Sequence, residues 1–341
     1  MRTSNSACLV AIMRNEGPYV LEWVAHHRAV GFDRILVFTN ACTDGTDRIL
    51  DRLMAMDEVV HAPNPKSAFP QLGVWQVAAL RYAAHFGAFK DSDWAMTVDA
   101  DEFVDVSVGD GSISALIEGT PDFDLMSLIV VPYGCNEVDR IDDGQVIKRF
   151  GFPTISLADL SAGTAKARAV KTLMRPGIKG AHFRNHRPKI DNFSKTGLIW
   201  VDGSGRPMAP EFTDQKTNLT SAAGALDLAH VNHYSVRSRE SFLLKCFRGD
   251  AVTKERLGLE TDAQVANAIT YWKKRHPGGT TEPHTPNRPA EFKNRYSQYL
   301  SDPALKALHE AALAAHAETL ARILETAPGQ TLAKGIGYSV S

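Results

Sequence analysis

The stretch "ACLVAIMRNEGPYVLEWVAHHRAVGFDRILVFT", residues 7–39, has the pattern of a strand, a helix and a second strand. Residues 7–13 are a continuous apolar run of the length of a buried strand, and residues 34–39 repeat this pattern. Between them Pro18 suits the first turn of a helix, and apolar residues keep helical spacing up to Gly31, a natural stop. Strand-helix-strand repetition predicts a parallel sheet, whose ligand site lies beyond the carboxyl ends of its strands.

The same alternation continues to residue 98. The turn-rich residues 40–46 precede a helix that we expect to end near Met56, and a short strand at 58–62, a helix at 74–86 and a strand at 94–98 follow. Beyond residue 120 the pattern is less regular, with strands expected at 124–131 and 170–176. Helical signals dominate from Ser238 onward, and Asp302 caps an Ala/Leu-rich helix over 303–325.

Composition narrows the class of protein. The chain has 341 residues, which is ample for one large or two modest domains, and its net charge of -1 argues against a nucleic-acid partner bound through bulk charge. The four cysteines form no C-x-x-C pair, which is typical of reduced thiols in a cytosolic protein. No apolar run reaches membrane-spanning length, so we expect a cytoplasmic protein without a transmembrane segment and leave peripheral membrane association open.

Carboxylates gather where the fourth predicted strand ends, in "WAMTVDADEFV", residues 94–104. Burying clustered carboxylates is costly unless a cation compensates them. Asp99 and Asp101 are one residue apart, so both can reach a hard divalent cation such as Mg²⁺ or Mn²⁺, which also bridges phosphate oxygens. The plain alternative is a pair of solvated turn residues, because D-x-D alone is a weak motif.

Several segments occur together in an order that carries a family resemblance. They are residues 11–46, "DWAMTVDADEFV", "GQVIKRF", "VKTLMRP" and "NHYSVRSRESFLLKCFRG". Over residues 7–250 they resemble the family 2-like glycosyltransferases, in particular the branch related to family 92. The resemblance implies a GT-A fold, which is a Rossmann-like, mostly parallel sheet flanked by helices, here with a C-terminal helical extension. It also implies inverting, metal-dependent hexosyl transfer from a UDP- or GDP-sugar to a glycan or glycoconjugate acceptor, as in cell-surface polysaccharide synthesis.

The resemblance also suggests how the chain is divided. Residues 1–235 would be the glycosyltransferase domain, with a nucleotide-binding half over 1–105 and an acceptor half over 106–235. Residues 236–326 would form a helical region, and residues 327–341 a flexible tail.

Site residues carry over unevenly from the family. Asp99 and Asp101 match its metal and nucleotide motif, and His233 is expected to add a metal or phosphate contact. Nucleotide contacts are expected from the loop after the first strand and from Asn40, which stands with Thr39 where the family usually has paired aspartates. Lys245 and Arg248 lie three apart on one helix face, so both can contact the diphosphate, although a solvated face would look the same. The residues expected to contact nucleotide are Arg14, Asn15, Glu16, Asn40, Asp99, Lys245 and Arg248.

The general base is the least determined residue. Glu137, in "YGCNEV" at 133–138, follows a strand of the second half and is the first candidate, with Asp191 as the alternative. Glu137 as a solvated loop carboxylate explains the sequence equally well.

Two other functions remain open at this point. A phosphatase of the haloacid dehalogenase type also places D-x-D after an apolar strand, but it wants a Thr just past the second Asp, where this chain has Glu102 and Phe103. A non-catalytic protein that binds a sugar nucleotide would show the same motifs without turnover.

Overall fold

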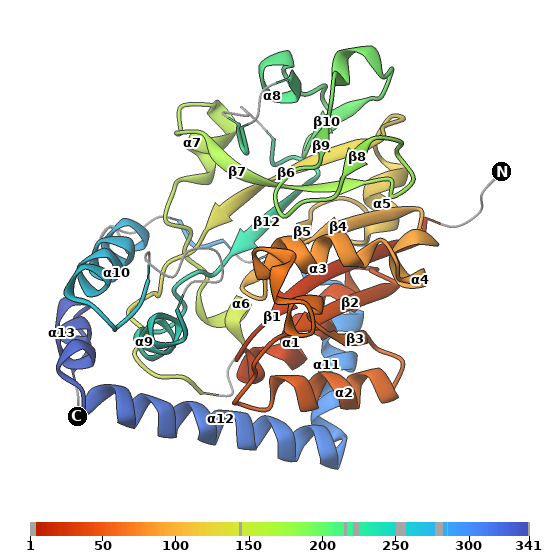
Figure 1. Ribbon diagram of the computed structural model, residues 1–341. Helices are drawn as coiled ribbons and strands as arrows, with labels where there is room; N and C mark the ends of the chain where they lie inside the picture. Colours follow the sequence, from red (N-terminus) through yellow and green to blue (C-terminus); the bar gives the residue numbers. More distant parts are fainter. Residues whose placement is uncertain are drawn as a thin grey trace.

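The computed structural model describes residues 5–142, 145–214, 217–220, 225–249, 257–276, 282–284 and 286–339 (Figure 1). Within these residues one large sheet follows the order β3-β2-β1-β4-β7-β6-β12-β5, with β10 beside β6 and β11 beside β7. The strands are β1 Ala7–Met13, β2 Arg34–Thr39, β3 Val60–Pro63, β4 Trp94–Thr97, β5 Glu102–Val106, β6 Leu125–Pro132, β7 Arg168–Met174, β10 Trp200–Asp202, β11 Leu219–Thr220 and β12 Ala229–His233. A separate hairpin joins β8 Ala181–His182 to β9 Lys189–Ile190.

Helices flank this sheet. They are α1 Gly17–Ala29, α2 Thr46–Ala55, α3 Trp75–Ala83, α4 Gly87–Lys90, α5 Ile113–Glu118, α6 Val146–Arg149, α7 Leu157–Ala162, α8 Pro210–Asp214, α9 Arg239–Arg248, α10 Asp262–Arg275, α11 Glu291–Ser301, α12 Pro303–Leu324 and α13 Ala327–Gly335. Short 3₁₀ turns lie at Pro65–Ser67, Pro70–Leu72 and Phe193–Lys195. None of the helices in the described ranges is both long and apolar enough to cross a membrane.

Strands β1 to β4 are parallel, and β7 and β5 run against their neighbours. The α/β architecture expected of a GT-A fold, a large and mostly parallel sheet flanked by helices, is therefore confirmed. Five expected strands begin and end within two residues of the observed bounds: 7–13, 34–39, 94–98, 124–131 and 170–176.

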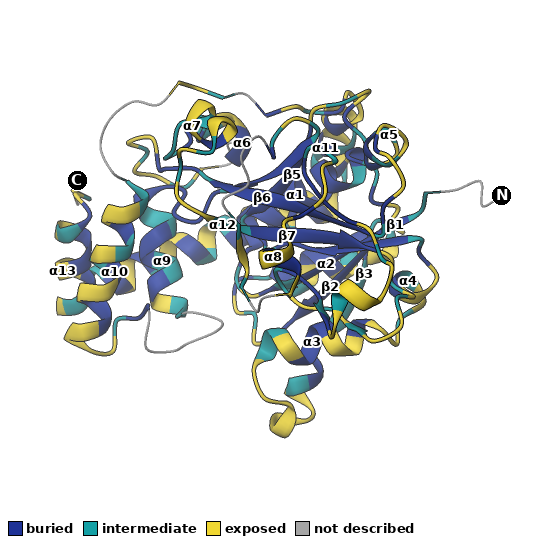
Figure 2. Ribbon diagram, turned by 90° about the horizontal axis from the view of Figure 1, so that it is seen from above, coloured by how far each residue is buried: buried dark blue, intermediate teal, exposed yellow. Residues whose placement is uncertain are grey.

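Alternation along the strands explains why both sheet faces are covered. Odd positions of β1, such as Leu9, join the core formed with α1 and α2, whereas even positions such as Val10 pack with α3 and α4. Figure 2 shows the strands buried and the outward sides of the helices exposed. Because each strand is apolar on both faces, residues 7–98 have the continuous apolar runs seen in the sequence.

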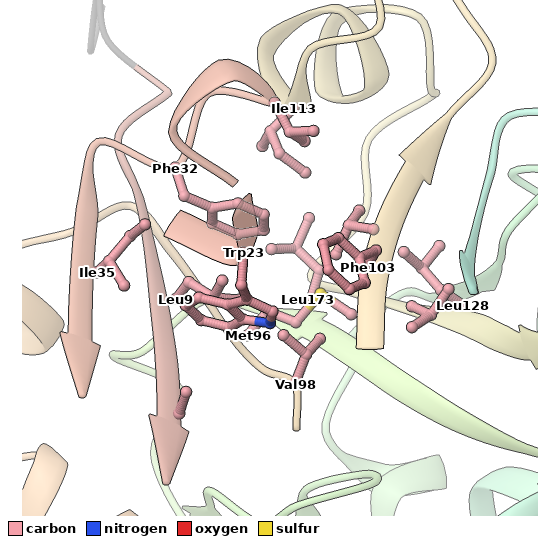
Figure 3. Packing of buried hydrophobic residues seen from close by; sticks show 14 of the residues in the cluster. Leu9, Trp23, Phe32, Ile35, Met96, Val98, Phe103, Ile113, Leu128 and Leu173 are labelled. Carbon is pink, nitrogen blue, oxygen red and sulfur yellow. The ribbon is translucent and has the colours of Figure 1, made fainter. Parts of the chain in front are cut away.

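Trp23 links the core to the end of β4. It is fully buried among Leu9, Met96 and Phe103 (Figure 3). Its indole Nε1 donates hydrogen bonds to the backbone oxygens of Asp99, at 3.2 Å, and Glu102, at 3.0 Å. The packing of α1 therefore fixes the turn that carries the D-x-D carboxylates.

The C-terminal helices pack against the helices of the first half and against one another. Helices α11 and α12 pack on α1, and α12 also packs on α2 and α9. A second cluster of buried apolar residues joins α9, α10 and α13, which lie side by side in Figures 1 and 2. Asp302 caps α12 as expected, since its side chain accepts a hydrogen bond from the Leu305 nitrogen.

Two expected boundaries differ from the structure. Residues 327–335 form α13 instead of a flexible tail, because Leu332, Ala333 and Ile336 are buried in the second cluster. The expected division between halves at residue 105 falls inside β5, which pairs with β12 from the far end of the acceptor half. Both features depend on long-range packing, which residue patterns do not show.

Candidate active site

A pocket lies where β1, β2 and β4 end. It is the edge at which parallel sheets bind ligands. The lining residues come from the loops after β1 and β2, the turn before β5, the segment after β12, and α1, α9 and α12. They are Asn15, Glu16, Tyr19, Thr43, Asp44, Asp101, Tyr234, Ser235, Val236, Arg237, Ser241, Leu244, Lys245, Phe247, Arg248, His316, Thr319 and Arg322.

Asp101 lines this pocket. One carboxylate oxygen accepts a hydrogen bond from Lys245 Nζ at 2.8 Å, and the other is 3.4 Å from His233 Nε2. Burial acts to raise the pKa of Asp101, but the charges of Lys245 and His233 outweigh it and hold the pKa well below its usual value. Asp101 is therefore an ionised carboxylate next to two cationic or basic groups.

Asp99 and Glu102 share a different cation. Lys171 of β7 has no exposed surface, and its Nζ lies 3.0 Å from Asp99 Oδ2 and 2.8 Å from Glu102 Oε2. Burial acts to lower the pKa of Lys171, but the charges of Asp99 and Glu102 outweigh it and raise the pKa. The carboxylate cluster that was unexplained in the sequence is thus compensated by Lys171 on one side and Lys245 on the other.

A third group of charges lines the pocket at the start of α1. Glu16 is bonded to Arg237 NH1 at 2.8 Å and also to Arg248. Burial acts to raise the pKa of Glu16, but the charges of Arg248 and Arg237 outweigh it and lower the pKa. Arg237 also stacks on the Tyr19 ring, 3.7 Å from its centroid. The pocket therefore brings together three cations, since Lys245 lies beside these two arginines.

The remaining predicted nucleotide contacts lie nearby. Asn15 exchanges hydrogen bonds with Thr43 at 2.8 and 3.0 Å, which joins the loops after β1 and β2. Arg14 is exposed, and its backbone oxygen accepts a hydrogen bond from Arg248. Asn40 follows β2 but is buried and does not line the pocket.

The two candidate bases lie outside the pocket lining. Glu137 is 68% exposed and forms ion pairs with Arg239 and with His276 Nε2, at 2.6 Å from the latter. The hydrogen bond from Arg239 is the main cause of a lowered Glu137 pKa. Asp191 is 67% exposed and lies 2.9 Å from Lys189 Nζ. Which carboxylate acts as the base stays a prediction.

Sequence reasoning missed several residues of this site. Lys171 could have been found, because a lysine inside an apolar strand indicates a buried partner for its charge. No comparable pattern in the sequence pointed to Arg237. His316 comes from α12, and its Nε2 is hydrogen-bonded to Asp44 Oδ2 at 2.9 Å. The two residues are more than 270 positions apart in the sequence, so only the packing of α12 brings them together.

A second group of polar residues lies elsewhere in the sheet. Among the described residues, Asp105, His230 and His284 place ligand-type atoms within 4.8 Å of one another, an arrangement that can hold a metal ion. None of the three was among the predicted ligands.

Comparison with solved structures finds distant likeness only. Staphylococcus aureus TarS (residues 1–349) in complex with UDP is 13% identical over 50% of this chain and 47% of that chain, with a TM-score of 0.32. A second crystal structure of TarS (1–349) aligns over 97% of this chain and 88% of that chain at 12% identity, with a TM-score of 0.34. The mannosyltransferase Ktr4p of S. cerevisiae with GDP gives 9% identity over 39% of this chain and 42% of that chain, with a TM-score of 0.25.

The alignment thus spans about half or less of the TarS–UDP and Ktr4p chains, and scores this low carry no argument about function. No curated protein matches the sequence. Residues 6–150, however, match the family model described as glycosyltransferase family 92. This stretch contains the loop after β1, the end of β2 and both D-x-D aspartates. The match confirms the resemblance inferred from the sequence over these residues, which are less than half of the chain, and it supports a glycosyltransferase.

Proposed function

We propose that this glycosyltransferase moves a hexosyl group, with inversion, from a UDP- or GDP-sugar to a hydroxyl of a glycan or glycoconjugate. The observation that carries the proposal is the pocket in which Asp101 and Glu16 lie beside Lys245, Arg237 and Arg248. The diphosphate of a sugar nucleotide carries two negative charges, and a pocket with several cations at the carboxyl ends of parallel strands suits it.

The proposed nucleotide position follows from the loops around the pocket. Asn15 and Thr43 form one rim and have amide and hydroxyl groups for a base or ribose. Lys245 and Arg248 of α9 also line the pocket, and the diphosphate would lie against these two cations. Arg14 and Asn40 would then contact the nucleotide from just outside the present lining.

A Mn²⁺ or Mg²⁺ ion is part of the proposal. Asp99, Asp101 and His233 would hold it, and their oxygen and imidazole donors suit such an ion. Lys171 and Lys245 already neutralise the two aspartates, so the ion would share or displace these lysine contacts. When bound, the ion would neutralise charge on the diphosphate.

In the proposed reaction a carboxylate, Glu137 or Asp191, takes the proton of the acceptor hydroxyl. The acceptor oxygen forms a bond to the anomeric carbon, and the bond from that carbon to the diphosphate breaks. The nucleoside diphosphate leaves with the electron pair, and Lys245 and Arg248 offset its growing charge. We further propose that the product belongs to cell-surface polysaccharide or glycoconjugate synthesis, carried out in the cytoplasm or at a membrane surface.

A donor screen tests this function. Melting temperatures would be measured with UDP-, GDP-, CMP- and dTDP-sugars, each with and without Mn²⁺, and with the matching nucleoside monophosphates as controls. We expect a diphosphate sugar to raise the melting temperature more than its monophosphate does, and slow release of free sugar from the same donor. Binding without any release would favour a non-catalytic binder, and hydrolysis of an aryl phosphate instead would favour a phosphatase.

A further inference from the structure

The strand pair β5–β12 carries a polar group that the proposed transfer does not use. Asp105 and His230 lie directly opposite each other in the antiparallel register. Because strand residues alternate between faces, Asp105, His230 and Asn232 lie on one face, while Glu102 and His233 lie on the other. The group is therefore separated from the D-x-D site by the sheet itself.

His284 reaches the same face from the connector between α10 and α11. Its Nε2 lies 3.4 Å from Asp105 Oδ2, and His230 Nε2 lies 3.6 Å from that same oxygen. Two donor atoms bound at about 2.0–2.1 Å to one tetrahedral ion are about 3.3 Å apart. A direct ion pair or charged hydrogen bond would instead close to about 2.7–2.9 Å. The spacing thus fits ligands around an ion better than a histidine–aspartate ion pair.

Hydrogen bonding supports the same conclusion. His230 is 3% exposed, yet neither of its ring nitrogens makes a well-formed hydrogen bond to any described residue. The Asn232 side-chain oxygen, fully buried on the same face, likewise makes no well-formed hydrogen bond within the described part of the chain. Buried polar atoms without partners are costly and rare, so their presence at one point calls for a ligand.

The carboxylate is held in place as a metal ligand would be. The Asn287 backbone nitrogen donates to Asp105 Oδ1 at 3.2 Å, and Asn232 Nδ2 donates to Asp105 Oδ2 at 3.1 Å. Such outer contacts orient the ligands of protein metal sites. His284 is also held by its own backbone, since its nitrogen donates to the Gly151 oxygen at 2.8 Å.

We propose that Asp105, His230 and His284 form a second metal site that takes a transition-metal ion, best suited to Zn²⁺, with the Asn232 oxygen as the fourth ligand. Two imidazoles and one carboxylate in a buried position favour Zn²⁺ over the harder Mg²⁺ and Mn²⁺. The ion is structural. It joins the sheet to the connector that leads into α11, and α11 in turn packs on α1. It does not depend on the proposed sugar transfer.

Metal content and stability test this site. The protein would be stripped with a chelator, titrated with Zn²⁺, and analysed by elemental mass spectrometry and thermal melting. We expect one Zn²⁺ per chain that survives dialysis and a higher melting temperature after its addition. Co²⁺ in its place should give the intense visible bands of a tetrahedral site, a readout that needs no variant.

Variants assign the ion to these residues. His284 is 27% exposed, so His284→Gln should fold, bind Zn²⁺ at least tenfold more weakly and lose the melting shift. The exposed His85 is the matched control, and His85→Gln should behave as wild type. Asp101→Asn should keep the Zn²⁺ stoichiometry, which separates this site from the donor site. A wild-type protein that retains no Zn²⁺, or a His284→Gln variant that binds it unchanged, would overturn the proposal.

Discussion

Replacing Lys171 by Met tests how the carboxylates of the D-x-D turn are stabilised. The side chain is fully buried, and its Nζ contacts Asp99, Glu102 and, at 2.8 Å, the Asn185 side-chain oxygen. Met keeps most of the volume and removes the charge. Breaking a buried ion pair from one side costs about 3–5 kcal/mol, against about 0–1 kcal/mol for an exposed pair.

The partners decide where in that range the effect lies. Glu102 is 3% exposed and would remain as an uncompensated buried charge, whereas Asp99 is 36% exposed and keeps contact with water. We therefore expect Lys171→Met to lower the free energy of unfolding by about 3 kcal/mol at pH 7, the lower end of the buried range. That is a large share of the roughly 5–15 kcal/mol typical of folded domains.

The loss should depend on pH in a defined direction. Without Lys171, burial raises the folded pKa of Glu102 further above its unfolded value. A group with a raised folded pKa destabilises the protein at high pH and ceases to do so below its unfolded pKa. The deficit of Lys171→Met should therefore shrink as the pH falls from 8 towards 4.

Urea unfolding followed by tryptophan fluorescence at pH 8, 7 and 5 measures these differences. The double variant Lys171→Met/Glu102→Gln should regain a substantial part of the lost stability. Lys179→Met, at an exposed lysine, is the matched control and should change stability little. A loss below about 1 kcal/mol, or a loss that is the same at every pH and in the double variant, would refute the charge-compensation reasoning.

Three further predictions follow from the site. Burial acts to raise the pKa of Asp44, but hydrogen bonds, first that from His316, lower it to about 2. Asp44→Asn should therefore lower the free energy of unfolding by about 2 kcal/mol at pH 7. In acid-unfolding curves this loss should vanish as the pH falls from 4 to 2. His233→Ala should reduce the turnover number for donor consumption more than donor affinity, because leaving-group charge is greatest in the transition state; unchanged turnover would exclude this role. If Glu137 is the base, Glu137→Gln should lower transfer about 10²–10⁴-fold with donor affinity retained; full activity would move the role to Asp191, to be tested with Asp191→Asn.

Local patterns made the elements of the first hundred residues predictable. The apolar runs of β1, β2 and β4 and the spacing of α1 belong to contiguous residues, so their periods show both the elements and the edge at which the strands end. Asn15, Glu16 and Asp101 follow strands at that edge and do line one pocket. Lys245 and Arg248 were found because three-residue spacing on a helix gives a shared face.

The features that were missed depend on distant partners. Lys171 is 72 residues from Asp99 in sequence and meets it only because β7 inserts beside β4. The Asp105–His230–His284 group forms because β5 and β12 pair in this register and because His284 lies beside them. Neither contact can be predicted from residues that are neighbours in the sequence. Residues 327–341 were expected to form a flexible tail, whereas buried Leu332 and Ile336 hold α13 in place.

Calorimetric titration of UDP and GDP in the presence of Mn²⁺ tests the central claim, that the pocket at Asp101 binds the donor nucleotide. The wild type should bind at least one of the two, and less tightly without the metal. Asp101→Asn should still fold, with a lower melting temperature because Lys245 loses its carboxylate partner. It should lose at least tenfold in affinity, about 1.4 kcal/mol, and Asp99→Asn should lose less. Asp122→Asn, at an exposed loop aspartate, should bind as the wild type does. Equal, metal-independent affinity in wild type and Asp101→Asn, or no binding of either nucleotide by the wild type, would contradict the account.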